Sequence, residues 1–288
     1  NYSCADHASL ADAMQRYLDE HGGRPRWGAI GLANPVTGDQ VRMTNSHWVF
    51  SISETQRRLG LTRFVVINDL TALALALPAL SPAELKPIGG GQAVAGAPLG
   101  VVGPGTGLGV AGLLPATAGR GAIPISSEGG HATLAPEDAQ EEAVIRVLRE
   151  RYGHASAERA LSGAGLVNLY QAVCVVQGVR GREIQAADVT TLALSGEDAQ
   201  CVAALDLFCA LLGSVAGNVA LMLCARGGIY IGGGIVPRLG AAFERSRFRE
   251  RFEAKGQLHD YVREIPTYVI QAQVSPALLG AARALEEL

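Results

Sequence analysis

The sequence predicts an α/β fold, in which strands and helices alternate along the chain. Short runs rich in Val, Ile and Leu, bounded by Gly, Asn or Asp, have the length and composition of buried strands. Helix-start patterns of the form Ser-x-x-Asp, Ser-x-x-Glu and Ser-Pro lie between several of these runs. The length of 288 residues is enough for one large α/β domain or for two smaller lobes that share a cleft.

The first part of the chain is expected to hold helices at both ends of a set of short strands. The elements expected here are a helix from Ser9 to Gly22, strands at 27–33 and 40–44 joined by a turn, a helix from Ser51 to Gly60, and a strand at 64–67. The run at 64–67 is apolar throughout, so we expect it to be buried on both faces. An apolar helix at 70–77 follows and is closed by Pro78.

The rest of the chain is expected to be richer in helices. A Gly/Pro-rich stretch at 87–98 is the best candidate for a boundary between lobes. The elements expected here are a short helix at 82–84, strands at 99–102, 110–114, 228–231 and 267–270, helices from 136 to about 224, and a closing helix at 275–285.

The apolar stretch at 202–225 is long enough to span a bilayer. It contains Asp206 and Asn218, however, and a charge at the centre of a bilayer is costly. Gly213 and Gly217 have the spacing of a contact face between two helices. We therefore expect a helix buried inside the protein rather than a membrane span.

The composition excludes several classes of function. A net charge of -3 without a basic cluster gives no electrostatic footprint for nucleic acid. The five cysteines are scattered and form no Cys-x-x-Cys pair, which argues for reduced thiols and against a zinc site or disulfide framework. The only lysines, Lys86 and Lys255, do not follow a glycine, so a Walker-type loop is absent. No export leader opens the sequence, and we expect a cytoplasmic protein.

Two polar residues, Asn68 and Asp69, directly follow the strand expected at 64–67. In α/β folds, ligands bind just beyond the carboxyl ends of strands. A carboxylate at this point is held by rigid structure on both sides, as a catalytic carboxylate should be. Both residue types are also good helix caps, so from these residues alone that alternative stays open.

The segment 103–109 is the strongest local signal in the sequence. Glycines at alternate positions leave the backbone bare, so successive N–H groups can point at one anion. Leu108 stands where the dinucleotide-binding pattern requires glycine, and Pro104 has no N–H to donate. The predicted phosphate contacts are Gly105, Thr106 and Gly107. A tight hairpin without a ligand is the alternative.

Two further loops carry candidate ligand groups. Glu128 and His131 place a carboxylate and an imidazole three residues apart on a flexible glycine turn. Such a pair can bind a metal, transfer protons or hydrogen-bond sugar hydroxyls, and metal is the weakest of the three without a nearby ligand cluster. An ordinary surface Glu and His is an equally open interpretation. Glycines at 232–234 follow a strand and let a flat ring or a backbone approach closely.

These segments together resemble bacterial hexokinase-type glucokinases. The segments that occur in the order of that family are 68–69, 103–109, 127–131 and 232–237, with further similarity at 43–48, 152–159 and 161–166. The resemblance runs from about Trp27 to the C-terminus. The Cys-rich zinc motif of the related repressor and sugar-kinase group is not found after His131, which favours the glucokinase branch.

The resemblance implies a two-lobed, actin-like ATPase fold of the ribonuclease H-like type, with glucose in the cleft between the lobes. The small lobe would comprise 1–79 and 272–288, and the large lobe would comprise 80–271. The implied reaction is transfer of the ATP γ-phosphate to the 6-hydroxyl of D-glucose by a homodimeric enzyme that also needs Mg²⁺. No residue is assigned as a metal ligand.

The resemblance also implies the role of each candidate site residue. Asp69 would be the general base that accepts the proton of the 6-hydroxyl. The glucose ligands would be Asn68, Asp69, Glu128, His131 and Glu158. The residues facing the ATP phosphates would be Gly105, Thr106 and Gly107, and those lining the adenosine would be Gly232, Gly233 and Gly234.

One departure from the family pattern concerns the first phosphate and Mg²⁺ loop, Asp-x-Gly-Gly-Thr, which is not found in this sequence. We therefore expect residues 1–288 alone to bind glucose weakly, to aggregate and to turn over ATP negligibly. A non-catalytic sugar-sensing protein on the same fold is the main alternative. An NAD-dependent oxidoreductase that uses the glycine-rich loop is a second alternative, against which Leu108 argues.

Overall fold

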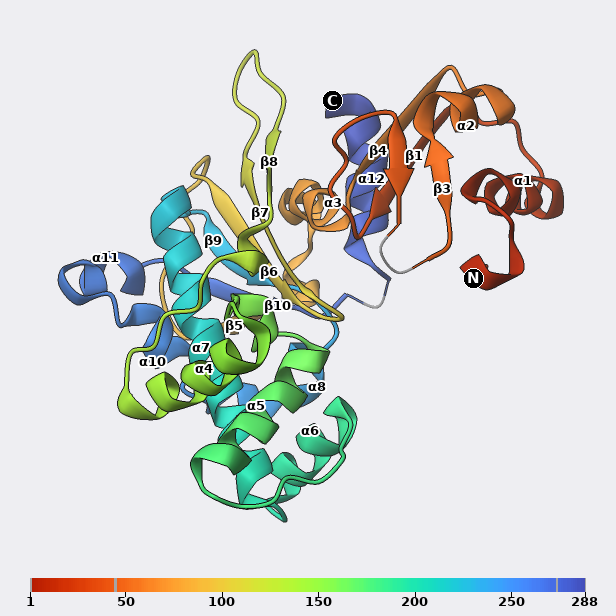
Figure 1. Ribbon diagram of the computed structural model, residues 1–288. Helices are drawn as coiled ribbons and strands as arrows, with labels where there is room; N and C mark the ends of the chain where they lie inside the picture. Colours follow the sequence, from red (N-terminus) through yellow and green to blue (C-terminus); the bar gives the residue numbers. More distant parts are fainter. Residues whose placement is uncertain (1, 44–45, 273, 288) are drawn as a thin grey trace.

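The computed structural model describes residues 2–43, 46–272 and 274–287, and a six-stranded sheet lies at its centre (Figure 1). The strands lie in the order β5-β10-β9-β6-β7-β8. They are β5 (Leu85–Ile88), β6 (Leu99–Pro104), β7 (Leu108–Leu114), β8 (Ile123–Ser127), β9 (Gly228–Ile231) and β10 (Thr267–Ile270). Strand β9 is parallel to β6 and β10, whereas β5, β7 and β8 pair antiparallel to their neighbours.

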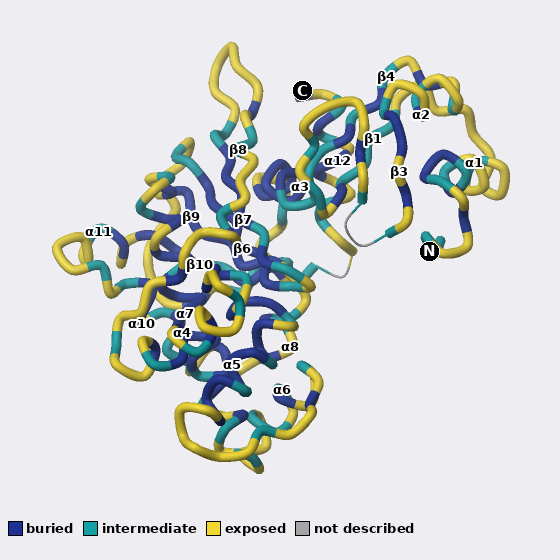
Figure 2. Tube along the Cα trace, viewed as in Figure 1, coloured by how far each residue is buried: buried dark blue, intermediate teal, exposed yellow. Residues whose placement is uncertain are grey.

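Helices cover both faces of this sheet because its central strands are apolar on both sides. On β6, Val101 contributes to the core beneath α3 and α12, whereas the next residue, Val102, contributes to the core beneath α7. On β9, Tyr230 and Ile231 divide in the same way. Figure 2 shows the central strands and α7 buried along most of their length. The sheet is therefore the middle layer of a three-layer α/β/α arrangement.

The larger helical layer is built around one long helix, α7. The helices of this layer are α4 (Ala139–Tyr152), α5 (Gly163–Val176), α6 (Ala186–Ser195), α7 (Ala199–Leu223), α8 (Val236–Leu239), α9 (Ala241–Glu244), α10 (Phe248–Glu253) and α11 (His259–Arg263). The apolar window of α7 could span a membrane by length and composition, but 67% of it is buried inside the fold. The prediction of a buried core helix agrees with this packing.

The glycines of α7 are needed for its contact with α10. A Cβ atom at Gly213 would lie 2.1 Å from the carbonyl oxygen of Phe248, and one at Gly217 would lie 2.5 Å from that of Phe252. The expected contact face of small residues is thus confirmed, and its partner is α10.

The smaller part of the molecule lies beyond α3 and α12 in Figure 1. Its strands are β1 (Trp27–Leu32), β2 (Gln40–Arg42), β3 (Val49–Ser51) and β4 (Arg63–Asn68), and its helices are α1 (Leu10–His21), α2 (Ile52–Arg58), α3 (Asp69–Ala76) and α12 (Pro276–Glu287). Strands β1 and β4 form a parallel pair that ends with Leu32 opposite Asn68. Strands β2 and β3 form a separate antiparallel pair.

The structure corrects three expectations for strands. The segments at 27–33 and 40–44 do not pair with each other, because β1 pairs with β4 and β2 with β3; Thr44 lies outside the described residues. In β4, only Phe64 and Val66 are buried, and Val65 lies half-buried against the α3 side, so the strand is not fully buried on both faces. The supposed boundary at 87–98 begins inside β5, which pairs with β10 in the central sheet.

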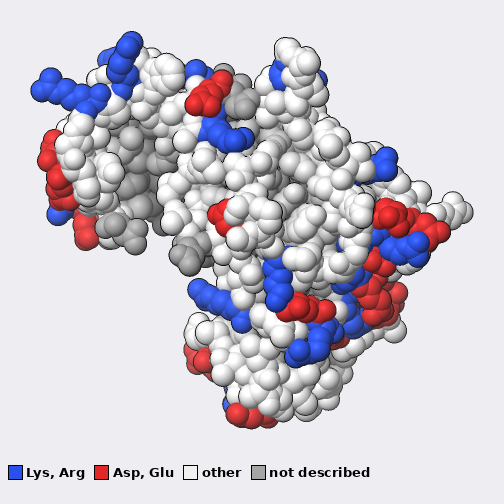
Figure 3. All heavy atoms as spheres, turned by 180° about the vertical axis from the view of Figure 1, so that it is seen from behind, with Lys and Arg blue, Asp and Glu red and all other residues white. Residues whose placement is uncertain are grey.

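A buried ion pair connects α4 and α10. The Glu141 side chain is completely buried, and its Oε1 lies 2.7 Å from Nη1 of Arg251. The Nη2 group of Arg251 donates a hydrogen bond of 2.9 Å to Oε2 of the same carboxylate. Elsewhere, basic and acidic side chains are interspersed on the face shown in Figure 3. All five cysteines are free, as expected.

Candidate active site

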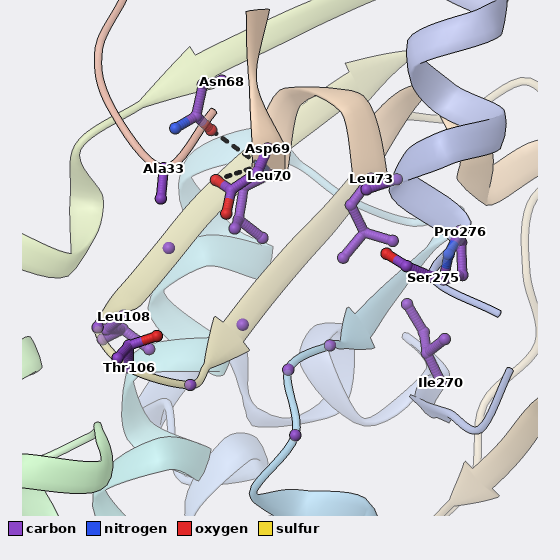
Figure 4. A pocket seen from close by; sticks show the side chains of 18 of the residues that line it. Ala33, Asn68, Asp69, Leu70, Leu73, Thr106, Leu108, Ile270, Ser275 and Pro276 are labelled. Atoms are coloured by element: carbon purple, nitrogen blue, oxygen red, sulfur yellow. Dashed lines mark hydrogen bonds between the residues drawn. The ribbon is translucent and has the colours of Figure 1, made fainter. Parts of the chain in front are cut away.

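A cleft of about 980 Å³ lies where several strands end. Its walls come from the segments that follow β4, β6 and β9, and from the start of α12 (Figure 4). All of the candidate site residues line this one cleft: Asn68, Asp69, Gly105, Thr106, Gly107, Glu128, His131, Glu158, Gly232, Gly233 and Gly234. The carboxyl ends of parallel strands β6 and β9 thus meet the end of β4, which is the usual ligand position in such folds.

Asn68 and Asp69 begin helix α3 and differ in how they are used. Asn68 is the N-cap, and its Oδ1 accepts hydrogen bonds of 2.9 and 3.2 Å from the backbone N–H groups of Leu70 and Thr71. The cap interpretation is therefore correct for Asn68. Asp69 accepts one bond of 2.9 Å from the N–H of Leu70 through Oδ1, and its second oxygen has no partner within the described residues. Figure 4 shows its carboxylate at the cleft.

The side chain of Leu70 fits between two glycines of the β6–β7 hairpin. A Cβ atom at Gly103 would lie 2.9 Å from Cδ1 of Leu70, and one at Gly109 would lie 2.3 Å from its Cγ. Two of the alternating glycines thus make room for Leu70 rather than baring the backbone for an anion. Because Leu70 follows Asp69 directly, this contact fixes the carboxylate relative to the hairpin.

The tip of the hairpin is a three-residue loop, Gly105 to Gly107, between paired Pro104 and Leu108. The N–H of Gly105 donates a hydrogen bond of 2.8 Å to the carbonyl oxygen of Gly107 and is therefore not free for a phosphate. The N–H groups of Thr106 and Gly107 have no partner in the part of the chain that the structure describes. The segment is both a tight hairpin and a candidate anion site, with fewer free donors than its sequence suggests.

The turn that carries Glu128 and His131 is held in place rather than flexible. Gly130 lies so close to β7 that a Cβ atom there would sit 1.9 Å from the carbonyl oxygen of Leu108. The N–H of Gly129 donates to Oγ of Ser127 at 2.9 Å. The glycines therefore serve close packing, and they leave the Glu128 and His131 side chains exposed in the cleft without described partners.

Glu158 reaches the hairpin from the opposite wall of the cleft. Its Oε2 accepts a hydrogen bond of 2.9 Å from the N–H of Leu108, and a Cβ atom at Gly107 would lie 2.5 Å from the same oxygen. Nothing in the sequence indicates this contact, because fifty positions separate the two residues.

The glycines after β9 do not all have the same use. A Cβ atom at Gly232 would lie 2.8 Å from Leu73, and one at Gly233 would lie 2.2 Å from the carbonyl oxygen of Pro104. Both glycines therefore allow the loop to lie on the sheet. Gly234 alone has open space around its Cα, so it is the position where a ligand can come closest to the backbone.

The charges of the cleft are mostly acidic. Asp69, Glu128 and Glu158 line it, and Arg238 of α8 is the only lysine or arginine among its described lining residues. Sequence reasoning missed Arg238, which follows the recognised 232–237 segment by one position. No group of three or more His, Cys, Asp or Glu side chains that could hold a metal ion occurs among the described residues.

Comparisons with known proteins agree with this geometry. The sequence matches the glucokinase family over residues 1–288. It is 52% identical over 285 residues to the glucokinase of Aromatoleum aromaticum, a match that covers 98% of this chain and 85% of that protein. The crystal structure of a glucokinase from an Antarctic psychrotroph superposes with a TM-score of 0.90 at 37% identity, covering 100% of this chain and 88% of that one.

A more distant structure shows the same fold. The glucokinase of Balamuthia mandrillaris, solved in complex with glucose, superposes with a TM-score of 0.80 at 22% identity and covers 96% of this chain and 82% of that one. The predicted α/β, actin-like fold is confirmed by these likenesses.

Proposed function

Because the chain belongs to the glucokinase family and therefore phosphorylates glucose with ATP, we propose that Asp69 is the general base of the reaction. The observation that carries this proposal is its carboxylate, which lies at the cleft with one oxygen bound to a backbone N–H and the other free. The bound oxygen fixes the orientation of the group, and the free oxygen can accept the proton of the 6-hydroxyl as that hydroxyl attacks the γ-phosphorus. Asp69 also starts α3, where the helix dipole favours a negative charge.

The glucose ligands we propose are the polar side chains around Asp69. Asn68 uses its oxygen as a helix cap, and its amide nitrogen donates a long hydrogen bond of 3.4 Å to the carbonyl oxygen of Leu32. The second hydrogen of that nitrogen is the group that we assign to a sugar hydroxyl. Glu128 and His131 add an acceptor and a ring nitrogen from the turn after β8, and Glu158 adds its Oε1, which has no described partner. Several hydroxyls can then be paired at once, which discriminates strongly against a sugar that lacks one of them.

The ATP phosphates are assigned to the hairpin tip. The free N–H groups of Thr106 and Gly107 are the proposed donors, and Gly105 is removed from the predicted set because its N–H is already bonded. Arg238 is the cation that we assign to the polyphosphate, because it is the only lysine or arginine among the described residues that line the cleft. We propose that the adenosine lies over the loop at 232–234, where Gly234 is open.

Mg²⁺ is expected to enter with ATP. This ion keeps several waters and is usually held by one or two carboxylates together with substrate phosphates. The described residues offer no cluster for it, so we assign no protein ligand and derive no step through it.

The proposed lobes are 1–79 with 272–288, and 80–271. This division is supported by the central sheet, all strands of which fall in the second unit, and by β1 to β4, which fall in the first. A homodimer remains a prediction from the resemblance, and a cytoplasmic location remains a prediction from the sequence.

The proposal is tested by glucose-dependent formation of ADP in a coupled assay, with isothermal titration of glucose as a second measurement. In a protein that also carries the Asp-x-Gly-Gly-Thr loop, we expect turnover with ATP and glucose, little with ATP alone, and loss of turnover on addition of EDTA that excess Mg²⁺ restores. Residues 1–288 alone should turn over ATP negligibly. Binding of glucose without turnover would instead support a sugar sensor on the same fold. Family membership already excludes the nicotinamide-dependent oxidoreductase.

A further inference from the structure

Glu158 bonds to the backbone of the candidate phosphate loop. Its Oε2 accepts the N–H of Leu108 at 2.9 Å, and Leu108 is only 5% exposed. The bond is partly buried, so loss of the carboxylate would leave this N–H poorly hydrated. The loop is therefore held by the same side chain that we assign to the sugar.

A second contact joins the two segments. The N–H of Gly163 donates a hydrogen bond of 2.8 Å to the carbonyl oxygen of Gly105. The segment 158–163 thus bonds to the loop at both of its ends, through Gly105 and through Leu108. Gly107 lies between these bonds, and a Cβ atom there would collide with Oε2 of Glu158.

The segment that carries Glu158 is itself rigid. The carbonyl oxygen of Glu158 accepts a hydrogen bond of 2.9 Å from Oγ of Ser162, which in turn caps α5 by accepting the N–H of Gly165 at 2.9 Å. The carbonyl oxygen of Arg159 accepts a hydrogen bond of 3.0 Å from Asn168. Because these bonds hold the segment together, a movement of Glu158 also moves the hairpin that is bonded to it.

We propose that Glu158 is a positioning residue that couples the binding of the two substrates. Its Oε2 holds the hairpin in the geometry that receives phosphate, and its Oε1, which has no described partner, meets the sugar. Bound glucose then holds the carboxylate of Glu158 in one position, and this carboxylate holds the hairpin tip at 105–107 in the geometry that receives phosphate. By reciprocity, each substrate raises the affinity for the other by the same factor. This inference rests on the proposed function, because it requires Glu158 to contact glucose.

The test measures ADP and glucose affinities by isothermal titration, each with and without the other ligand. The proteins compared are the wild type, Glu158→Ala, Glu158→Gln and His131→Ala. His131→Ala is the matched control, since His131 lines the sugar side of the cleft and makes no described side-chain bond to the hairpin.

In Glu158→Ala, we expect ADP affinity without glucose to fall about tenfold, because the N–H of Leu108 loses its acceptor. Glucose should tighten ADP binding several-fold in the wild type and leave it unchanged in this variant. Glu158→Gln keeps a carbonyl oxygen for the N–H, so it should retain most of the ADP affinity while weakening glucose. His131→Ala should weaken glucose only.

Wild-type ADP affinity in Glu158→Ala would overturn the proposal. Unchanged glucose affinity in that variant would also overturn the proposal. The conclusion that the protein is a kinase would still stand, because turnover is measured separately. If Glu158→Ala does not fold, hydrogen exchange of a peptide containing 105–109 in the wild type replaces it. Glucose alone should slow that exchange, and an unchanged rate would refute the coupling.

Discussion

Two groups of acidic side chains in this protein differ in what they meet. Glu141 is completely buried, and its carboxylate is matched by the two terminal nitrogens of Arg251. Asp69 and Glu128 line an open cleft in which Arg238 is the only lysine or arginine of the described lining. A buried charge must be paired to be tolerated, whereas a carboxylate at a cleft can stay unpaired because water reaches it. The pairing of the first group stabilises the fold, and the lack of pairing in the second leaves its oxygens free for substrates.

The sharpest test of this comparison is Asp69→Ala. Loss of a general base typically lowers kcat by ~10²–10⁴-fold, or about 3–5 kcal/mol of barrier. The free energy of unfolding should change little, because within the described residues this side chain bonds only to the adjacent N–H of Leu70. Glucose affinity should stay largely intact, because the other proposed ligands remain in the cleft. Coupled-assay kcat and titration of glucose measure both effects. Retention of most of the wild-type kcat would remove Asp69 from the role of base.

For Glu141→Ala, we expect a loss of stability rather than a direct loss of kcat. Without Glu141, Arg251 keeps only the longer contacts to Glu137 at 3.4 Å and Asp138 at 3.5 Å. Breaking a buried ion pair typically lowers the free energy of unfolding by about 3–5 kcal/mol, and these contacts place the expected loss at the lower end of that range. The neighbouring Glu142 is exposed on the same helix, so Glu142→Ala is the matched control and should change stability by less than about 0.5 kcal/mol. Urea denaturation measures the difference. Equal stability of the two variants would contradict a stabilising role for the buried pair.

Arg238→Ala removes the only lysine or arginine among the described residues that line the cleft. Hydrogen bonds to charged groups contribute about 1.5–3 kcal/mol, so we expect KM for ATP to rise about tenfold or more, with KM for glucose nearly unchanged. Arg245, exposed and outside the lining, is the control position. A rise in KM for ATP that is equal in Arg245→Ala would show that overall charge, rather than contact, is responsible.

The smallest effect concerns Asp138, the N-cap of α4. Burial by itself would raise the pKa of Asp138, but the N–H of Glu141 and the guanidinium of Arg247 outweigh it, so the pKa lies below the usual 3.8. A carboxylate with a lowered pKa stabilises the fold above its ordinary pKa, and this stability is lost as the pH falls through the folded-state value. Asp138→Asn should therefore lower Tm at pH 6, and the difference from the wild type should vanish in acid below that value. A difference that does not depend on pH would show that the charge is irrelevant.

Much of the fold could be predicted because its signals are local. The capping serines at Ser9 and Ser51, the apolar strands and the long buried helix are all written in neighbouring residues, and the structure confirms them. The pairing of β1 with β4 could not be predicted in this way, because the turn at 34–39 suggested a hairpin, whereas the partner strand lies thirty-six positions further along the chain.

The candidate site shows the same limit. Asn68 and Asp69 were identifiable from their position at the end of a strand. The loops at 103–109, 128–131 and 232–234 were identifiable from their residue patterns, and Glu158 came from the family resemblance alone. The alternating glycines at 103–109 were interpreted as leaving the backbone bare for an anion, but Gly103 and Gly109 contact Leu70, which is distant in the sequence. The hydrogen bond from the N–H of Gly105 to Gly107 could not be predicted for a related reason, because only the folded hairpin shows the acceptor. The roles in catalysis and binding remain predictions.

The fit of Leu70 between Gly103 and Gly109 also has a mechanical consequence. Helix α3 is clamped on its other side by α12, where a Cβ atom at Gly280 would lie 1.6 Å from the carbonyl oxygen of Ala72. The side chain of Leu70 must therefore leave the space between the two glycines before α3 can separate from the hairpin. The distance between the proposed base and the proposed phosphate loop is thus set by the side chain of Leu70. A single methyl group added at Gly109 would change this distance without contacting either substrate.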